Sequence, residues 1–268
     1  MYYYLAMDVY KQFRTKIYTV IGLIIAILIG LFILNFKGCD FKFPGSKPKP
    51  TPTPEPTVVP TPTPTPEITP TPEPTIVPAG VDLESDDSIT RYVSVTHLLP
   101  ETYVPADLRD VNVHSAATKQ LRDEAAGKLE EMFQAAIDDH IYLKLVDGYR
   151  SYQEQKDLFS YYTQVRGAYY ASVVDDHPGG SEHQLGLAAD IGCWNGACEL
   201  AYCFKDYPNY KWLQENSWKY GWIERYPEGK QSITSIVYSP WHYRYLGLEE
   251  AQKVYESGLT MEEYYNIQ

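Results

Sequence analysis

Positive charge is scarce in this chain, whose 268 residues include 23 Lys and Arg against 35 Asp and Glu, a formal net charge of −12. Proteins that bind nucleic acid present a basic surface to the phosphates, so this composition argues against a nucleic-acid partner. Cysteine is also scarce, at four residues, which excludes a scaffold held together by many disulfides. The length fits one sizeable domain with accessory segments, at roughly 100–200 residues per domain.

Charge and proline are distributed unevenly along the chain. Residues 1–80 carry a net charge of +2, whereas the remaining 188 residues carry −14. Fourteen of the 20 prolines lie between Pro44 and Pro78. The composition therefore separates an N-terminal accessory part from an acidic body at 81–268.

An uncharged apolar run extends from Ile17 to Phe36. Twenty helical residues span about 30 Å, the thickness of a bilayer core, so this run predicts a transmembrane helix after a cytoplasmic segment at 1–16. A cleaved signal peptide is the alternative, but its apolar region is shorter, at ~7–15 residues, and ends in small residues. Lys and Arg flank the run on both sides, so their positions do not decide its orientation.

Residues 37–80 contain Pro at nearly every second position over long stretches, as in TPTPEPTVVPTPTPTPEITPTPEP. Such spacing is incompatible with helix and sheet and favours an extended polyproline II chain. At ~3.1 Å per residue, the segment from Pro44 to Pro78 could reach on the order of 100 Å. We interpret it as a stalk. A ligand for a proline-binding module is the alternative.

The hydrophobic periodicity of the body predicts an α+β fold, with an antiparallel sheet and flanking helices. The expected elements are strands at 89–99, 141–146, 185–191, 222–226 and 241–246 and helices at 115–137, 151–166, 210–220 and 248–256.

Two of the six histidines stand in unusual surroundings. His183 lies in the segment PGGSEHQLGLAAD, seven residues before Asp190, and His242 lies in SPWHYRY. Two imidazoles and one carboxylate form a suitable ligand set for a catalytic zinc ion, with the fourth position left for water. The alternative is that each histidine is a satisfied core or surface residue, and the spacing alone does not decide between them.

Three blocks of sequence indicate a family. They are DGYRSYQEQ at 147–155, SEHQLGLAAD at 181–190, and RYPEGK at 225–230 followed by PWHYRY at 240–245. Together they resemble the motifs S-G-Y-R-S-Y-x-x-Q, S-x-H-x-x-G-x-A-x-D, R-Y-P-x-G-K and P-W-H-F-R-Y of the VanY-like D-alanyl-D-alanine carboxypeptidases. These zinc peptidases are grouped with lysostaphin-type and hedgehog-type domains, and the resemblance covers about residues 90–250.

The resemblance implies roles for individual residues. His183, Asp190 and His242 would bind one Zn²⁺ ion. Arg150 would hold the carboxylate end of the peptide or the developing oxyanion, since a guanidinium offers a planar fork of donors, or else form a structural ion pair. The remaining expected substrate contacts are Tyr149, Gln155, Ser181 and Trp241, with loop capping as the alternative for Gln155 and Ser181.

One position departs from the family pattern. Three residues before the last zinc histidine, the family has a Glu that takes a proton from the zinc-bound water and passes it to the leaving amine, whereas this chain has Ser239. A hydroxyl is a poor general base near neutral pH. Glu224 is a candidate substitute. Asp175 and Asp176, in the loop before PGGSEH, are two further candidates that could swing into the site. Glu182 is expected to point away from the metal, because successive strand residues point to opposite faces.

Three cysteines lie close together after Asp190. A disulfide in an oxidising exterior is the expected state, either Cys198–Cys203 or Cys193–Cys198, with one thiol left free. No nearby His or further Cys pair supports a metal site there.

These features predict a membrane-anchored zinc D,D-carboxypeptidase that acts on the D-Ala-D-Ala terminus of peptidoglycan stem peptides. Its body would lie outside a bacterial cell with a Gram-positive type of wall. Two alternatives remain: a zinc-dependent binder of wall peptides that does not cleave them, because of Ser239, and a peptidase that cleaves a different wall-peptide bond.

Overall fold

The computed structural model describes residues 80–267. The predicted segment 1–16, the predicted transmembrane helix 17–36 and all but the last residue of the predicted stalk lie outside this range. Among the helices of residues 80–267, none combines the length and the apolar character needed to cross a membrane.

The body is built around an antiparallel four-stranded sheet, which confirms the predicted α+β class. Its strand order is β3-β4-β6-β5, and a separate hairpin pairs β1 with β2. The strands are β1 (Leu108–Asp110), β2 (Gln120–Arg122), β3 (Leu143–Asp147), β4 (Ala188–Cys193), β5 (Trp222–Glu224) and β6 (His242–Tyr245).

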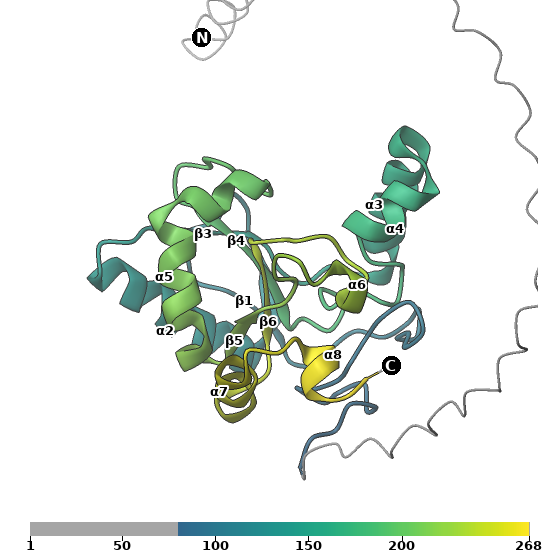
Figure 1. Cartoon of the computed structure of the whole chain (residues 1–268), viewed down its shortest axis with the longest axis horizontal. Coiled ribbons are helices and arrows are strands. Elements are labelled where there is room, and N and C mark those ends of the chain that lie inside the picture. Colours follow the sequence, from purple (N-terminus) through teal and green to yellow (C-terminus); the bar gives the residue numbers. More distant parts are fainter. Residues whose placement is uncertain (1–79, 268) are drawn as a thin grey trace, which may run out of the picture. The chain divides into compact units, whose positions relative to one another are not determined.

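Helices lie on both sides of the sheet. The α-helices are α2 (Asp123–Asp138), α3 (Tyr152–Arg166), α4 (Ala168–Val174), α5 (Pro208–Asn216), α6 (Gln231–Thr234), α7 (Leu248–Ser257) and α8 (Met261–Tyr264), and two 3₁₀ turns are η1 (Tyr202–Asp206) and η2 (Ser217–Tyr220). Figure 1 shows α2 and α5 on one side of the sheet and α3 and α4 on the other.

The two faces of the central strands have different roles. Ala189 and Ile191 of β4 and Tyr243 and Tyr245 of β6 belong to the main hydrophobic core, together with the apolar face of α2. Side chains alternate between faces along a strand, so Asp190 and the residues of β6 next to these tyrosines point to the other face. The candidate site lies there, opposite the core.

Most predicted elements are present, with shifted boundaries. Ser151 caps α3 as part of a capping box, because its hydroxyl accepts from the Glu154 N–H while the Glu154 carboxylate accepts from the Ser151 N–H. The predicted helix at 115–137 begins only at Asp123, and the residues before it contribute β2.

The predicted strand at 89–99 is wrong. This segment is irregular, and the Arg244 side chain donates to the backbone carbonyls of Ile89 and Arg91 at 2.9 and 2.8 Å. A buried guanidinium thus satisfies carbonyl groups that a neighbouring strand would otherwise pair.

The structure also selects between the two predicted disulfides. Cys198 and Cys203 form the bond, with their Cα atoms 5.6 Å apart, and Cys193 is a buried free thiol at the end of β4.

Candidate active site

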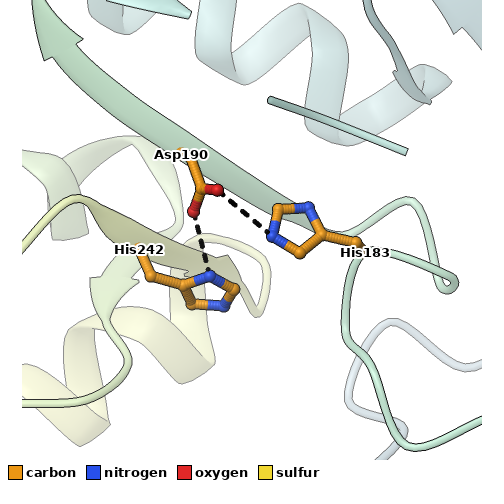
Figure 2. A group of neighbouring side chains, drawn as sticks. All are labelled: His183, Asp190 and His242. Carbon is orange, nitrogen blue, oxygen red and sulfur yellow. Dashed lines mark hydrogen bonds and ion pairs between the residues drawn. The ribbon is translucent and has the colours of Figure 1, made fainter. Parts of the chain in front are cut away.

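The fold brings together the three side chains that were predicted as zinc ligands. Asp190 of β4 and His242 of β6 are paired residues of adjacent strands, and His183 comes from the turn that precedes β4. Asp190 Oδ1 lies 3.1 Å from His242 Nδ1, and Asp190 Oδ2 lies 3.6 Å from His183 Nε2 (Figure 2). All three residues are buried, and each offers a ligand atom within 4.8 Å of the others.

Hydrogen bonds on the far side of each imidazole orient the two histidines. His183 Nδ1 donates to the Gly148 carbonyl at 2.6 Å, and His242 Nε2 donates to Glu182 Oε2 at 3.2 Å. Each bond leaves the other ring nitrogen directed at Asp190. Metal-binding histidines characteristically donate their second nitrogen to a carbonyl or carboxylate, which fixes the tautomer.

The charges at the site favour a cation. Burial acts to raise the pKa of Asp190, but the two neighbouring imidazoles hold it well below its usual range. Burial acts to lower the pKa of His242, but the carboxylates of Asp190 and Glu182 raise it to about 9. The donor set of two imidazoles and one carboxylate, with the second nitrogens occupied, therefore fits zinc.

Glu182 does not line the cavity, but it contacts the side of His242 that faces away from Asp190, a role that the prediction did not include. Residues 182–186 form a turn rather than a strand, so the strict alternation of side chains does not apply. The carboxylate is buried, and its Oε1 accepts from Arg225 Nε at 2.7 Å and from Arg244 at 3.1 Å. The glycines on both sides of the SEH segment were a turn signal that sequence reasoning did not use.

A small cavity of about 60 Å³ opens at the three ligands. Its lining consists of Arg150, Val174, Asp175, Asp176, His183, Asp190, Tyr226, Ile236, Ser239, Trp241 and His242. A larger groove of about 680 Å³ is lined by Asp110, Thr118, Lys119, Gln120, Asp147, Tyr149, Arg150, Glu154 and Leu158. Arg150 borders both spaces, so it stands between the candidate metal centre and a groove large enough for a peptide.

Comparison with known proteins identifies the family. The model of VanY, D-alanyl-D-alanine carboxypeptidase, matches residues 118–248. The putative carboxypeptidase YodJ of Bacillus subtilis (strain 168) is 38% identical over 188 residues, which cover 68% of this chain and 69% of YodJ. The chain belongs to the VanY family.

Solved structures of VanY relatives have the same fold. The LdcB LD-carboxypeptidase, whose structure concerns peptidoglycan recognition, is 38% identical with a TM-score of 0.64, over 68% of this chain and 87% of LdcB. VanYB in complex with D-Ala-D-Ala is 32% identical with a TM-score of 0.56, over 66% and 97% of the two chains. A mutant of the D,D-pentapeptidase VanY, in complex with Zn(II), gives the same identity and TM-score, over 66% and 98%.

The predicted substrate residues of this VanY-family chain have different environments. Arg150 donates to Asp147 Oδ2 at 2.7 Å and to Gln155 Oε1 at 2.6 Å, which holds the guanidinium at the junction of cavity and groove. Tyr149 lines the groove, and Trp241 lines the cavity. All three are placed where a peptide could reach them.

The side chains of Gln155 and Ser181 instead form hydrogen bonds with other residues of the protein. Gln155 is fully buried, and its amide nitrogen donates to Asp175 Oδ1 at 3.0 Å and to the Asp176 carbonyl at 2.6 Å. Ser181 is also fully buried, and its hydroxyl accepts from the His183 N–H at 3.4 Å. These contacts favour the capping and positioning roles over direct contact with a substrate.

Ser239, which occupies the position of the VanY-family Glu, lines the cavity. Glu224, the candidate substitute, does not line it. The Ser239 hydroxyl donates to the Val237 carbonyl at 3.0 Å. Glu224 accepts from the Tyr210 hydroxyl at 3.1 Å and is absent from the cavity lining. The structure therefore does not bring Glu224 to the three candidate ligands, whereas both Asp175 and Asp176 line the same cavity as these ligands.

Proposed function

We propose that this protein is a zinc-dependent D,D-carboxypeptidase that releases the terminal D-alanine from peptidoglycan stem peptides. The observation that carries the proposal is the buried set of His183, Asp190 and His242, with the second nitrogen of each imidazole already hydrogen-bonded. The VanY relatives that bind D-Ala-D-Ala and Zn(II) support the substrate and the metal.

The chain's own residues supply binding and orientation. Arg150 presents a guanidinium at the junction of the groove and the cavity, where it can pair with a peptide carboxylate or with the oxyanion of the transition state. Tyr149 in the groove and Trp241 in the cavity offer apolar surface to the peptide. Zinc, when bound, supplies a Lewis acid that activates water near neutral pH.

We also propose that the protein acts outside a bacterial cell. The apolar run at 17–36 would anchor it to the membrane, and the proline-rich segment at 37–80 would hold the body at a distance, within a wall of the Gram-positive type. The Cys198–Cys203 disulfide supports an oxidising compartment.

A second candidate function is the binding of wall peptides without cleavage. Ser239 favours it, because a hydroxyl near the zinc ligands cannot take up a proton as a carboxylate does. Such a protein would retain the metal, Arg150 and the groove, and would recognise the same D-Ala-D-Ala terminus.

One experiment separates these functions. The full-length protein, purified in detergent and loaded with zinc, is incubated with a pentapeptide ending in Lys-D-Ala-D-Ala and, separately, with a tetrapeptide ending in Lys-D-Ala. His183→Ala serves as the blank, and Ser239→Glu is measured beside it. We expect D-alanine release from the pentapeptide by the unmodified protein.

Each other result has a defined meaning. Release from the tetrapeptide alone would replace the D,D specificity with L,D specificity. Release only by Ser239→Glu would assign the wild-type protein to the binding function. If neither protein releases D-alanine from either peptide, the proposed peptidase activity is wrong.

A further inference from the structure

Two aspartates follow α4 and border the cavity that contains the zinc ligands. Asp175 and Asp176 lie in the lining together with His183, Asp190 and His242. The fully buried Gln155 holds the backbone of Asp176, because its amide nitrogen donates to the Asp176 carbonyl at 2.6 Å. Gln155 also accepts from Arg150 at 2.6 Å, so one amide couples this loop to the residue at the mouth of the groove.

The two aspartates differ in what occupies their carboxylates. Asp175 Oδ1 accepts from the Gln155 amide at 3.0 Å and lies 3.6 Å from the Arg150 guanidinium, while its Oδ2 is buried without a hydrogen-bond partner. Asp176 has a weaker tie, a hydroxyl contact of 3.5 Å from Tyr226 to its Oδ1. Asp176 is thus the cavity carboxylate that the protein's own donors engage less, since Gln155 and Arg150 both hold Asp175.

Asp176 lies next to the zinc ligands without being one of them. The Tyr226 ring that contacts it is 4.9 Å from the His242 ring, centroid to centroid. Within residues 80–267, no hydrogen bond or ion pair joins Asp176 to either histidine, and the metal-binding cluster does not include it. A general base needs this position, within the same cavity as the metal but outside its ligand set.

The protonation behaviour of Asp176 suits proton transfer. Burial raises its pKa to about 6, against the opposing influence of the two histidines. Proton transfer is most effective when the pKa of the base is near the working pH. A divalent cation in the cavity would favour the charged form and so keep the group a carboxylate at neutral pH.

We propose that Asp176 is the general base of this protein, in place of the Glu that Ser239 replaces. One carboxylate oxygen of Asp176 accepts a proton from the water that attacks the scissile carbonyl carbon. As the new C–O bond forms and the C–N bond breaks, Asp176 donates that proton to the amine of the leaving D-alanine, which regenerates the carboxylate. The inference rests on the proposed peptidase function.

The matched test replaces one carboxyl group by an amide at two half-buried positions. Asp176→Asn and Glu224→Gln are prepared in the full-length, zinc-loaded protein, and Glu224 is the control because it lies outside the cavity. We expect Asp176→Asn to lower kcat by ~10²–10⁴, the typical loss for a general base, and Glu224→Gln to remain within about twofold of the wild type.

Two measurements besides turnover distinguish the loss of a base from damage to the site. Zinc content should remain one ion per chain in both variants. A phosphinate analogue of D-Ala-D-Ala imitates the tetrahedral transition state, so its Kd, measured by calorimetry, should rise about tenfold or more in Asp176→Asn and stay unchanged in Glu224→Gln. A rescue variant completes the test: Ser239→Glu added to Asp176→Asn should restore turnover, since it returns a carboxylate to the same cavity.

The outcomes separate this inference from the function on which it rests. Wild-type turnover that survives in Asp176→Asn would overturn the role of Asp176 and leave the peptidase function intact. Turnover by Ser239→Glu alone would also overturn it, because Asp176 would then not serve the wild-type protein as a base. Inactivity of both the wild type and Ser239→Glu would overturn the peptidase function itself.

Discussion

Glu182 Oε2 lies 3.2 Å from His242 Nε2, on the side of the imidazole that faces away from Asp190. The other oxygen of the same carboxylate accepts from Arg225 and Arg244. Burial acts to raise the pKa of Glu182, but the two guanidinium groups and the imidazole hold it well below its usual range. One buried carboxylate therefore joins the candidate metal centre to a buried charge network.

The first prediction concerns Glu182→Gln. This change replaces the charged acceptor of the His242 N–H by a neutral one, which makes the ring a weaker ligand. We expect zinc affinity to fall by roughly 10–100-fold, the usual cost of losing such a partner. Competition with a chelator of known affinity measures it.

Glu262→Gln is the matched control for this prediction. Glu262 accepts from Arg225 at 2.6 and 3.0 Å and does not contact His242. Either substitution leaves a buried guanidinium partly unpaired, so both should lower the free energy of unfolding, by up to about 3–5 kcal/mol. Equal zinc affinities in the two variants would contradict the role assigned to Glu182.

The second prediction concerns Arg150→Lys. A lysine keeps the positive charge but lacks the planar fork that contacts Asp147 and Gln155 at once. We expect kcat/KM for the pentapeptide to fall by about 10–100-fold, because a hydrogen bond to a charged group contributes about 1.5–3 kcal/mol. Zinc content should not change.

Arg109→Lys is the control for the change of side chain. Arg109 pairs with Asp123 and Glu130 on the β1–α2 surface, outside the cavity and the groove. Its substitution should leave kcat/KM unaltered. A similar loss in both variants would assign the effect of Arg150→Lys to general destabilisation.

The third prediction is a pH dependence of stability caused by Glu224. Burial raises the pKa of this carboxyl to about 7, with hydrogen bonds from Tyr210 and Gln214 opposing the shift. The folded protein therefore binds more protons than the unfolded chain between about pH 4.5 and 7, and stability contributed by Glu224 falls as the pH rises through this window.

Denaturant unfolding at several pH values measures this contribution. The loss across the window is of the order of 3 kcal/mol, since the pKa rises from 4.5 to about 7 and one pKa unit corresponds to about 1.4 kcal/mol. In Glu224→Gln the difference between pH 5 and pH 8 should be smaller by that amount. An identical pH profile in the wild type and the variant would show that the carboxyl group is not held in the neutral form.

The fourth prediction concerns the disulfide. Cys203→Ser removes the bond to Cys198, which closes a short loop next to η1, so the unfolded chain becomes less constrained. We expect a loss of roughly 2 kcal/mol in the free energy of unfolding and unchanged zinc affinity. Reduction of the wild-type protein should have the same effect, whereas Cys193→Ser should leave the sensitivity to reduction in place.

Local sequence signals were sufficient where short-range interactions decide the structure. The hydrophobic periodicity at 151–166 predicted α3, and the Ser151–Glu154 capping box sets its start, because a cap and its helix involve neighbouring residues. The segment at 89–99 has the composition of a strand but is irregular, because Arg244, more than 150 residues away, satisfies its carbonyl groups. Such a long-range contact has no local signature.

The sequence by itself determined the family and the three zinc-ligand candidates, because the motif blocks specify both the residue types and their order. It also determined the α+β class, through the hydrophobic periodicity of the body. Only the tertiary structure decided which carboxylates reach the site. Glu182 reaches His242 through a turn, Glu224 lies beside Tyr210 outside the cavity, and Asp176 lies within it. The physical reason is that the direction of a side chain depends on the strand, turn or loop that carries it and on the elements packed against it, and residues far apart in the chain set both.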